Sequence, residues 1–237
     1  LLSLSSVILL GCNYQAVYYK FQHSSSLCRC LPYYQTFTMT KAYLQFLIYS
    51  LFILTTCNCQ EKKTSYNPKA IEFNNKAMEF IKTEKFDSSL IYLDKAIKID
   101  STYYIAYGNK CIVYCTLKDF KNALVVTEKE IKAKPDLAEG WTFAGMLNDK
   151  LGDTLNALKY YKKSIEIFDE RISNPDKQTY LKANKLNRAI ALILIGQNDK
   201  GRDELRKLKQ IYPSDEFIDD FLKLNKQEYL KQIFNDE

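Results

Sequence analysis

The chain has 237 residues, of which 46% are hydrophobic, and its 34 Lys and Arg against 28 Asp and Glu give a formal net charge of +6. The basic residues are scattered among acidic ones and form no basic stripe interleaved with aromatic residues, so the sequence does not predict nucleic-acid binding. Only seven Gly and five Pro occur in the chain, which favours an all-α fold.

The amino-terminal stretch, residues 1–38, shows no hydrophobic period, and the chain begins with Leu. We expect this stretch to be disordered. It is either the remainder of a truncated start or sequence that is not translated, upstream of a start at Met39.

A signal-peptide pattern begins at Met39. Lys41 supplies a positive charge, and the uncharged residues 42–56 supply an apolar core. That core is shorter than the roughly twenty residues that span a bilayer. Residues 39–57 are therefore predicted to form a signal peptide and residues 58–66 a polar tether, and the alternative is an uncleaved anchor helix.

Residues 54–57, Leu-Thr-Thr-Cys, resemble the lipobox of bacterial lipoproteins. The resemblance implies cleavage before Cys57 and a lipid on that residue, which anchors the chain at a membrane surface of the bacterial cell envelope. Residues 9–12, Leu-Leu-Gly-Cys, also fit the motif, but no basic segment precedes them. Cys57 is favoured over Cys12 as the lipidated residue.

Residues that could carry chemistry are sparse. His23 is the single histidine, and the pairs Cys28/Cys30 and Cys57/Cys59 lack the C-x-x-C spacing of zinc ribbons. The folded part carries no nucleophile motif or phosphate-binding loop. We therefore predict no enzymatic activity, no metal, no cofactor and no small-molecule substrate.

A period of 34 residues organises residues 67–213, in units that begin at residues 70, 104, 138 and 182. Small side chains recur at the eighth and twentieth positions of each unit. Two helices that cross closely need small residues where they touch, so this pattern predicts consecutive helix pairs. The small residues are Ala77, Cys111, Gly145 and Ala189 at position eight, and Ser89, Ala123, Ala157 and Gly201 at position twenty.

The period and these small positions, together with a bulky Phe73, Tyr107 or Trp141 at position four, resemble the tetratricopeptide repeat (TPR). The resemblance implies an all-α, right-handed superhelix of about four helix pairs, at residues 70–103, 104–137, 138–171 and 182–215. The fourth unit begins ten residues late. We expect the preceding helix to run to about Arg171, and the next helix to start near Lys177 and to be longer than usual.

Residues 214–237 carry apolar side chains at helical spacing. We predict one helix that caps the exposed apolar face of the last repeat. The alternative is a helix that binds a partner.

In this family the first helices of the pairs line a concave groove, mainly through positions two, five, nine and twelve. We predict that this groove binds an apolar or amphipathic segment of a protein partner. The alternative is that position nine only packs between neighbouring helices. One subfamily grips a carboxylate with Lys at position five and Asn at position nine, and that clamp is absent here. The candidate groove residues are Asn74, Gly108, Thr142 and Leu186 at position five, and Met78, Ile112, Met146 and Ile190 at position nine.

The sequence thus predicts a membrane-tethered scaffold for protein–protein interaction. One alternative is a structural subunit of an envelope assembly complex, similar in architecture to the TPR lipoprotein of the barrel-assembly complex. The other is a soluble cytoplasmic scaffold whose first sixty residues are misannotated.

Overall fold

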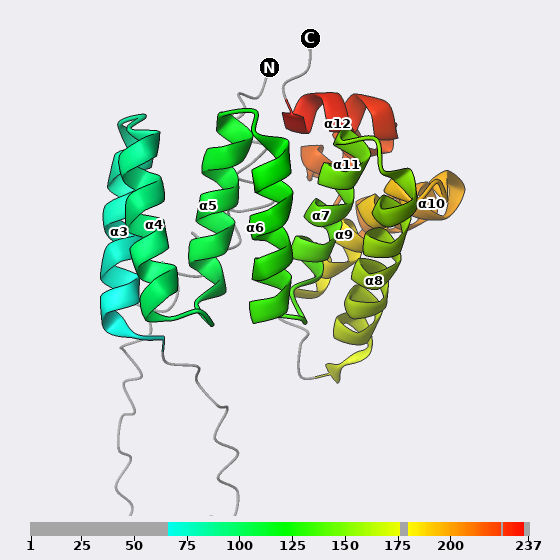
Figure 1. Cartoon of the computed structure of the whole chain (residues 1–237). Coiled ribbons are helices and arrows are strands. Elements are labelled where there is room, and N and C mark those ends of the chain that lie inside the picture. The colour runs from blue at the N-terminus through cyan, green and yellow to red at the C-terminus, as the bar shows by residue number, and fades with distance from the viewer. Residues whose placement is uncertain (1–65, 176–179, 224, 235–237) are drawn as a thin grey trace, which may run out of the picture. The chain divides into compact units, whose positions relative to one another are not determined.

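The computed structural model describes residues 66–175, 180–223 and 225–234, which all belong to one compact unit. All regular secondary structure in these residues is helical (Figure 1). The predicted segment 1–38, the signal peptide and the tether up to residue 65 lie outside the described residues. None of the described helices is long and apolar enough to cross a membrane.

Consecutive helices pair along the chain, and each pair packs on the next (Figure 1). This arrangement confirms the predicted all-α fold of helix pairs. The pairs are α3 (Pro68–Lys82) with α4 (Phe86–Ile99), α5 (Tyr104–Thr116) with α6 (Phe120–Ala133), α7 (Ala138–Lys150) with α8 (Thr154–Ser173), and α9 (Leu181–Leu194) with α10 (Asn198–Ile211).

The small residues at positions eight and twenty are all buried, as the steric argument requires. The two glycines show how close the helices come. A Cβ atom built on Gly201 would lie 2.7 Å from the backbone oxygen of Ala189, and one built on Gly145 would lie 2.5 Å from a ring carbon of Tyr161. Positions eight and twenty of the fourth pair therefore touch, with no room for a methyl group between them.

The turn between the two helices of every pair places position fifteen in the left-handed region. The φ angles are +56° at Glu84, +57° at Lys118, +86° at Gly152 and +93° at Gly196. Glycine adopts this conformation without steric cost, whereas other residues pay roughly 1 to 2 kcal/mol. The turns of the third and fourth pairs are thus better matched to their sequence than those of the first two.

Before the fourth unit, α8 is longer than the other second helices, whereas α9 has the usual length of a first helix. Helix α8 has 20 residues and ends at Ser173, whereas α9 begins at Leu181 and has 14. The expectation that this helix is longer than usual is therefore wrong, and its expected start near residue 177 lies outside the described residues. The extension is held to α7, because Phe168 is fully buried and Arg171 bonds the Glu139 carboxylate at 2.8 Å.

The prediction of one capping helix in the tail is also wrong, because two helices form there, α11 (Glu216–Lys223) and α12 (Lys226–Phe234). Asn225 separates them. Its side chain accepts a hydrogen bond from the Glu228 backbone N–H at 2.9 Å, and the Glu228 carboxylate accepts one from the Asn225 N–H at 3.4 Å. This reciprocal pattern is a capping box, which starts a new helix. Helix α11 covers the last pair, with Ile218 fully buried there.

Candidate partner-binding groove

The first half of the predicted groove lies on α3 and α5. Met78 and Ile112, at position nine of these helices, are partly exposed. Asn74 and Gly108, at position five, are buried. The Asn109 side-chain amide donates to the Asn74 side-chain oxygen at 2.7 Å, so Asn74 joins the first two pairs and does not face the groove freely.

The second half lies on α7 and α9, and most of its predicted residues are covered. Thr142 is buried and donates to the backbone oxygen of Ala138 at 3.1 Å. Met146 and Ile190, at position nine, are only 6% and 7% exposed, and Leu186 is partly buried. Position nine therefore behaves differently in the two halves of the groove.

Helix α12 packs against the end of this second half. Its apolar residues Leu230, Ile233 and Phe234 belong to the same buried cluster as Met146 and Ile190. In Figure 1, α12 crosses the ends of α6 and α7 near the top of the view. The alternative interpretation, that position nine simply packs inside the fold, thus describes Met146 and Ile190 but not Met78 and Ile112.

Aromatic side chains hold the end of α12. The Phe234 ring lies 5.1 Å from the Phe120 ring of α6 and 6.2 Å from the Phe143 ring of α7, measured between centroids. The Lys150 ammonium lies 6.0 Å from the centroid of the same Phe234 ring. Phe234 thus fills a site formed by two aromatic rings and a cation.

A buried carboxylate holds the start of α12. The side chain of Asp149, at position twelve of its unit, is only 6% exposed and bonds the Lys226 ammonium at 2.6 Å. The Tyr161 hydroxyl donates to the same carboxylate oxygen at 2.6 Å. Burial, and then this hydrogen bond, raise the pKa of Tyr161 well above its usual value, so the hydroxyl stays a donor.

Sequence reasoning named a partner-binding helix in the tail only as an alternative, and it did not place that helix in the groove. The signal was present, because Lys226, Leu230, Ile233 and Phe234 recur on one helical face. The same spacing fits a cap equally well, and only the structure shows which surface the face meets.

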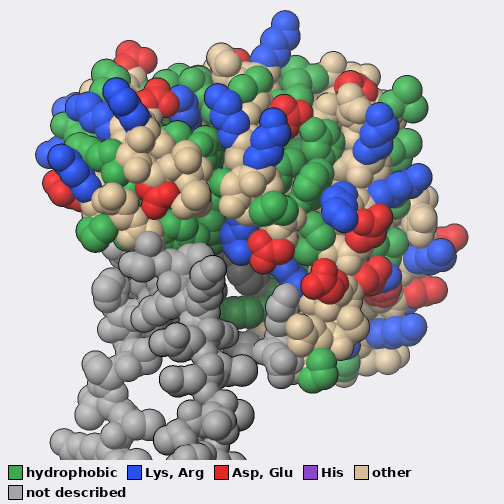
Figure 2. Space-filling view, turned by 60° about the horizontal axis from the view of Figure 1, so that its bottom comes forward, with side chains coloured by type: hydrophobic (Ala, Val, Ile, Leu, Met, Phe, Trp, Pro, Cys, Tyr) green, Lys and Arg blue, Asp and Glu red, His purple; other side chains and the backbone are tan. Residues whose placement is uncertain are grey.

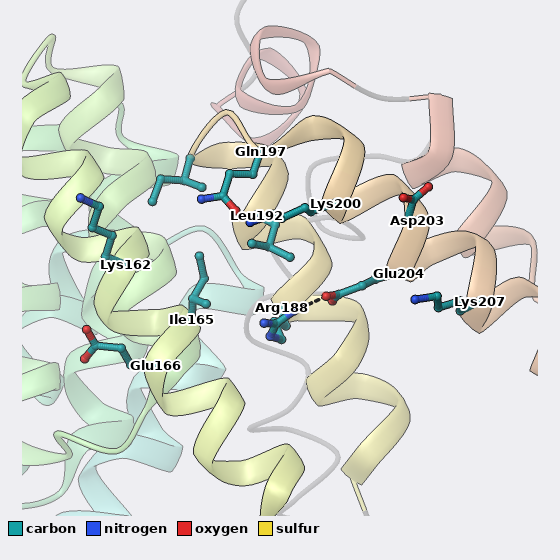
Figure 3. A pocket seen from close by; sticks show the side chains of 11 residues that line it. Lys162, Ile165, Glu166, Arg188, Leu192, Gln197, Lys200, Asp203, Glu204 and Lys207 are labelled. Atoms are coloured by element: carbon teal, nitrogen blue, oxygen red, sulfur yellow. Dashed lines mark hydrogen bonds and ion pairs between the residues drawn. The ribbon is translucent and has the colours of Figure 1, made fainter.

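An open cleft of about 470 Å³ lies between α8, α9 and α10 (Figure 3). Its central charge, Arg188, already bonds two carboxylates, Asp169 at 2.5 Å and Glu204. Lysines and acidic residues are mixed around it, and Figure 2 shows the same mixture on one face of the described residues. The cleft presents no set of converging polar groups that selects a ligand.

The described residues contain no group of three side chains that could hold a metal ion. Cys111 and Cys115 are both buried, with their sulfur atoms 4.0 Å apart. The neighbouring Cys115 thiol and burial raise the pKa of Cys111, which keeps this thiol protonated. The two cysteines act as small core residues on one face of α5.

Comparison with protein families finds the tetratricopeptide repeat at residues 73–103 and 138–170. A FAM10 family protein of Arabidopsis thaliana is 34% identical over 112 residues, which cover 47% of this chain and 25% of that protein. The TPR repeat-containing protein MJ1428 of Methanocaldococcus jannaschii is 28% identical over 183 residues, 76% of this chain and 29% of that protein. The Hsp70-Hsp90 organizing protein of Triticum aestivum is 25% identical over 83 residues, 35% of this chain and 14% of that protein.

The chain thus spans less than a third of the length of these relatives. Among solved structures, YrrB, described as a TPR protein with an unusual peptide-binding site, has a TM-score of 0.44 and 19% identity, over 70% of this chain and 85% of YrrB. MamA has a TM-score of 0.43 and 14% identity, over 61% of this chain and 79% of MamA. The family match falls on helix pairs whose small residues are buried in the expected register, so residues 73–103 and 138–170 carry tetratricopeptide repeats.

Proposed function

We propose that this protein is a non-catalytic scaffold that binds an apolar or amphipathic segment of a partner protein in the groove on α3 and α5. One observation carries the proposal. Four apolar side chains, at positions two and nine of the two adjacent first helices, are partly exposed. They are Ile71, Met78, Ile105 and Ile112.

The chemistry of these four residues favours an apolar ligand face. Aliphatic side chains and an adaptable thioether offer contact area but no charge, which suits the anchor residues of a partner helix or extended segment. Positions five and nine carry no Lys and Asn pair that would hold a terminal carboxylate. The relative from Triticum aestivum is named an Hsp70-Hsp90 organizing protein, so similar repeats occur in a protein named for organising others.

Photo-crosslinking in living cells tests the groove. A photoreactive amino acid at Met78 or Ile112 is expected to capture the same partner, whereas one at Ile91 or Val125, exposed on the second helices α4 and α6, is not. Adding Met78→Glu to a chain with the photoreactive residue at Ile112 should weaken capture by about tenfold or more, as loss of an apolar anchor does. Equal capture from all four positions, identified by mass spectrometry, would refute the groove as the binding site.

We further propose that a lipid on Cys57 tethers the protein to a membrane surface of the bacterial cell envelope. The support is the basic start at Lys41, the apolar residues 42–56 and the lipobox-like residues 54–57. The polar stretch that follows Cys57 would give the repeats freedom to reach a partner.

Metabolic labelling with a fatty-acid analogue tests the tether. Cys57→Ala is expected to abolish labelling, because the lipid would be carried by the Cys57 thiol and by the amino group that cleavage before Cys57 exposes. Cys59→Ala and Cys12→Ala serve as matched controls and are expected to retain the label. Undiminished label on Cys57→Ala, measured on the purified protein, would remove the tether from the proposal.

A further inference from the structure

We infer that α12 is an internal ligand of the second half of the groove, and that this half binds an amphipathic partner helix with one basic residue and an aliphatic–aromatic face, which displaces α12. The inference rests on the proposed function, because it extends the partner-binding groove from α3 and α5 to α7 and α9. It also defines the chemistry of the ligand more closely than the residues on α3 and α5 do.

The site offers one charge that requires a cation. Asp149 lies in the groove with 6% of its side chain exposed, and Tyr161 holds one of its oxygens at 2.6 Å. The Tyr161 ring is itself fully buried, so this oxygen has a fixed position. When a helix covers the site, a carboxylate buried to this degree is costly unless that helix brings a cation to pair with it. Lys226 supplies that cation in the chain as it stands.

The rest of the site is apolar and shaped for aromatic and aliphatic groups. Phe120 and Phe143 flank the Phe234 ring, and Met146 and Ile190 share a buried cluster with Leu230 and Ile233. The four α12 residues that face the site are separated by four, three and one positions, which is one face of a helix. This geometry is that of an amphipathic helix in a hydrophobic groove.

The remaining question is whether α12 belongs to the fold or occupies a site on it. The helix pairs make their main contacts without it, because α5 packs on α6, α7 on α8 and α9 on α10. Helix α11 completes the last pair, with Ile218 fully buried and Lys209 bonding the Asp219 carboxylate at 2.5 Å. Helix α12 has nine residues, fewer than the roughly twelve to fifteen an isolated helix needs, so it depends on the groove for its own structure.

A tethered helix competes with a free one through its effective concentration, about 1 mM for a short connection. Suppose that a free helical segment binds the empty site with a Kd of about 0.1 mM. Competition from the attached α12 then weakens the apparent affinity of the free segment for the intact chain by about tenfold. Releasing α12 from the site should therefore raise the affinity of the free segment by about tenfold.

The test uses the full chain and a labelled peptide with the sequence of residues 225–236. Leu230→Asp with Phe234→Asp releases α12, and Lys231→Asp with Gln232→Asp is the matched control, because both of its positions are exposed on the same helix. Fluorescence anisotropy is expected to show about tenfold tighter peptide binding to the released chain than to the wild type and the control. Equal affinity for all three chains would overturn the inference.

A charge exchange keeps the test valid if the released chain loses some stability. A peptide that carries Lys226→Glu is expected to lose about tenfold in affinity for the released chain, and adding Asp149→Lys to that chain should recover part of it. No recovery, with the helix content unchanged by circular dichroism, would contradict the assigned orientation. Neither measurement involves Met78 or Ile112, so a failure of this test can be told apart from a failure of the crosslinking experiment.

Discussion

Replacing Gly201 with Val is expected to lower the free energy of unfolding by about 3 kcal/mol, the upper end of the usual cost of overpacking. The first added carbon would already lie 2.7 Å from the Ala189 backbone oxygen and 2.7 Å from a side-chain carbon of Ile193. The backbone oxygen is part of α9 and cannot turn aside as a flexible side chain could. The two helices of the fourth pair would have to separate.

Lys200→Val is the matched control, because Lys200 is exposed on the same helix and the change costs only the lower helix propensity of Val, roughly half a kcal/mol. Repeat proteins are stabilised by nearest-neighbour contacts, so the damage should be local. Hydrogen exchange is expected to speed up in α9, α10 and α11, with α3 and α4 nearly unchanged. Similar unfolding curves for Gly201→Val and Lys200→Val in urea would refute the close contact.

Truncating Tyr161 to Ala is expected to cost about 4 kcal/mol, within the range for removing a buried aromatic side chain. The ring is fully buried and fills the space that Gly145 leaves open. Its hydroxyl also orients the Asp149 carboxylate. The substitution therefore removes packing and a hydrogen-bond donor at one point.

Tyr160→Ala, one residue away, is the control and should cost much less stability. Tyr160 is partly exposed, and its ring is tilted against the Trp141 ring with 5.7 Å between the centroids. A double-mutant cycle sharpens the result. Gly145→Ala is expected to destabilise the wild type, because its Cβ would lie 2.5 Å from the Tyr161 ring, but to be tolerated beside Tyr161→Ala. Additive free energies of unfolding, measured by denaturant titration, would show that the two residues do not share one space.

The helix pairs could be predicted from sequence because their cause is local and repeated. Small residues 34 positions apart mark places where backbones approach, and that requirement does not depend on the rest of the molecule. The glycines at 145 and 201 show it most directly, since each stands where even a methyl group would collide. The turns at Gly152 and Gly196 were also predictable from a local cause, because their positive φ angles favour glycine.

The candidate groove was only partly predictable, because contacts distant in sequence decide it. Asn74 has the sequence position of a groove residue, but it is buried in a hydrogen bond with Asn109 of the next repeat. Met146 and Ile190 belong to the groove by position, yet they are buried in one cluster with residues of α12, which lies dozens of residues away. The capping box at Asn225 and Glu228 was visible in the sequence, but it competed with an unbroken apolar pattern.

The buried amide pair Asn74–Asn109 favours the correct association of the first two helix hairpins during folding. Hairpins of similar shape could associate with the wrong neighbour during folding, since each offers a similar apolar face. A misplaced hairpin at the first junction would bury an amide with no partner, at a cost of about 1 to 3 kcal/mol. The 2.7 Å bond between these two side chains therefore favours packing of the second hairpin beside the first over packing beside a wrong neighbour.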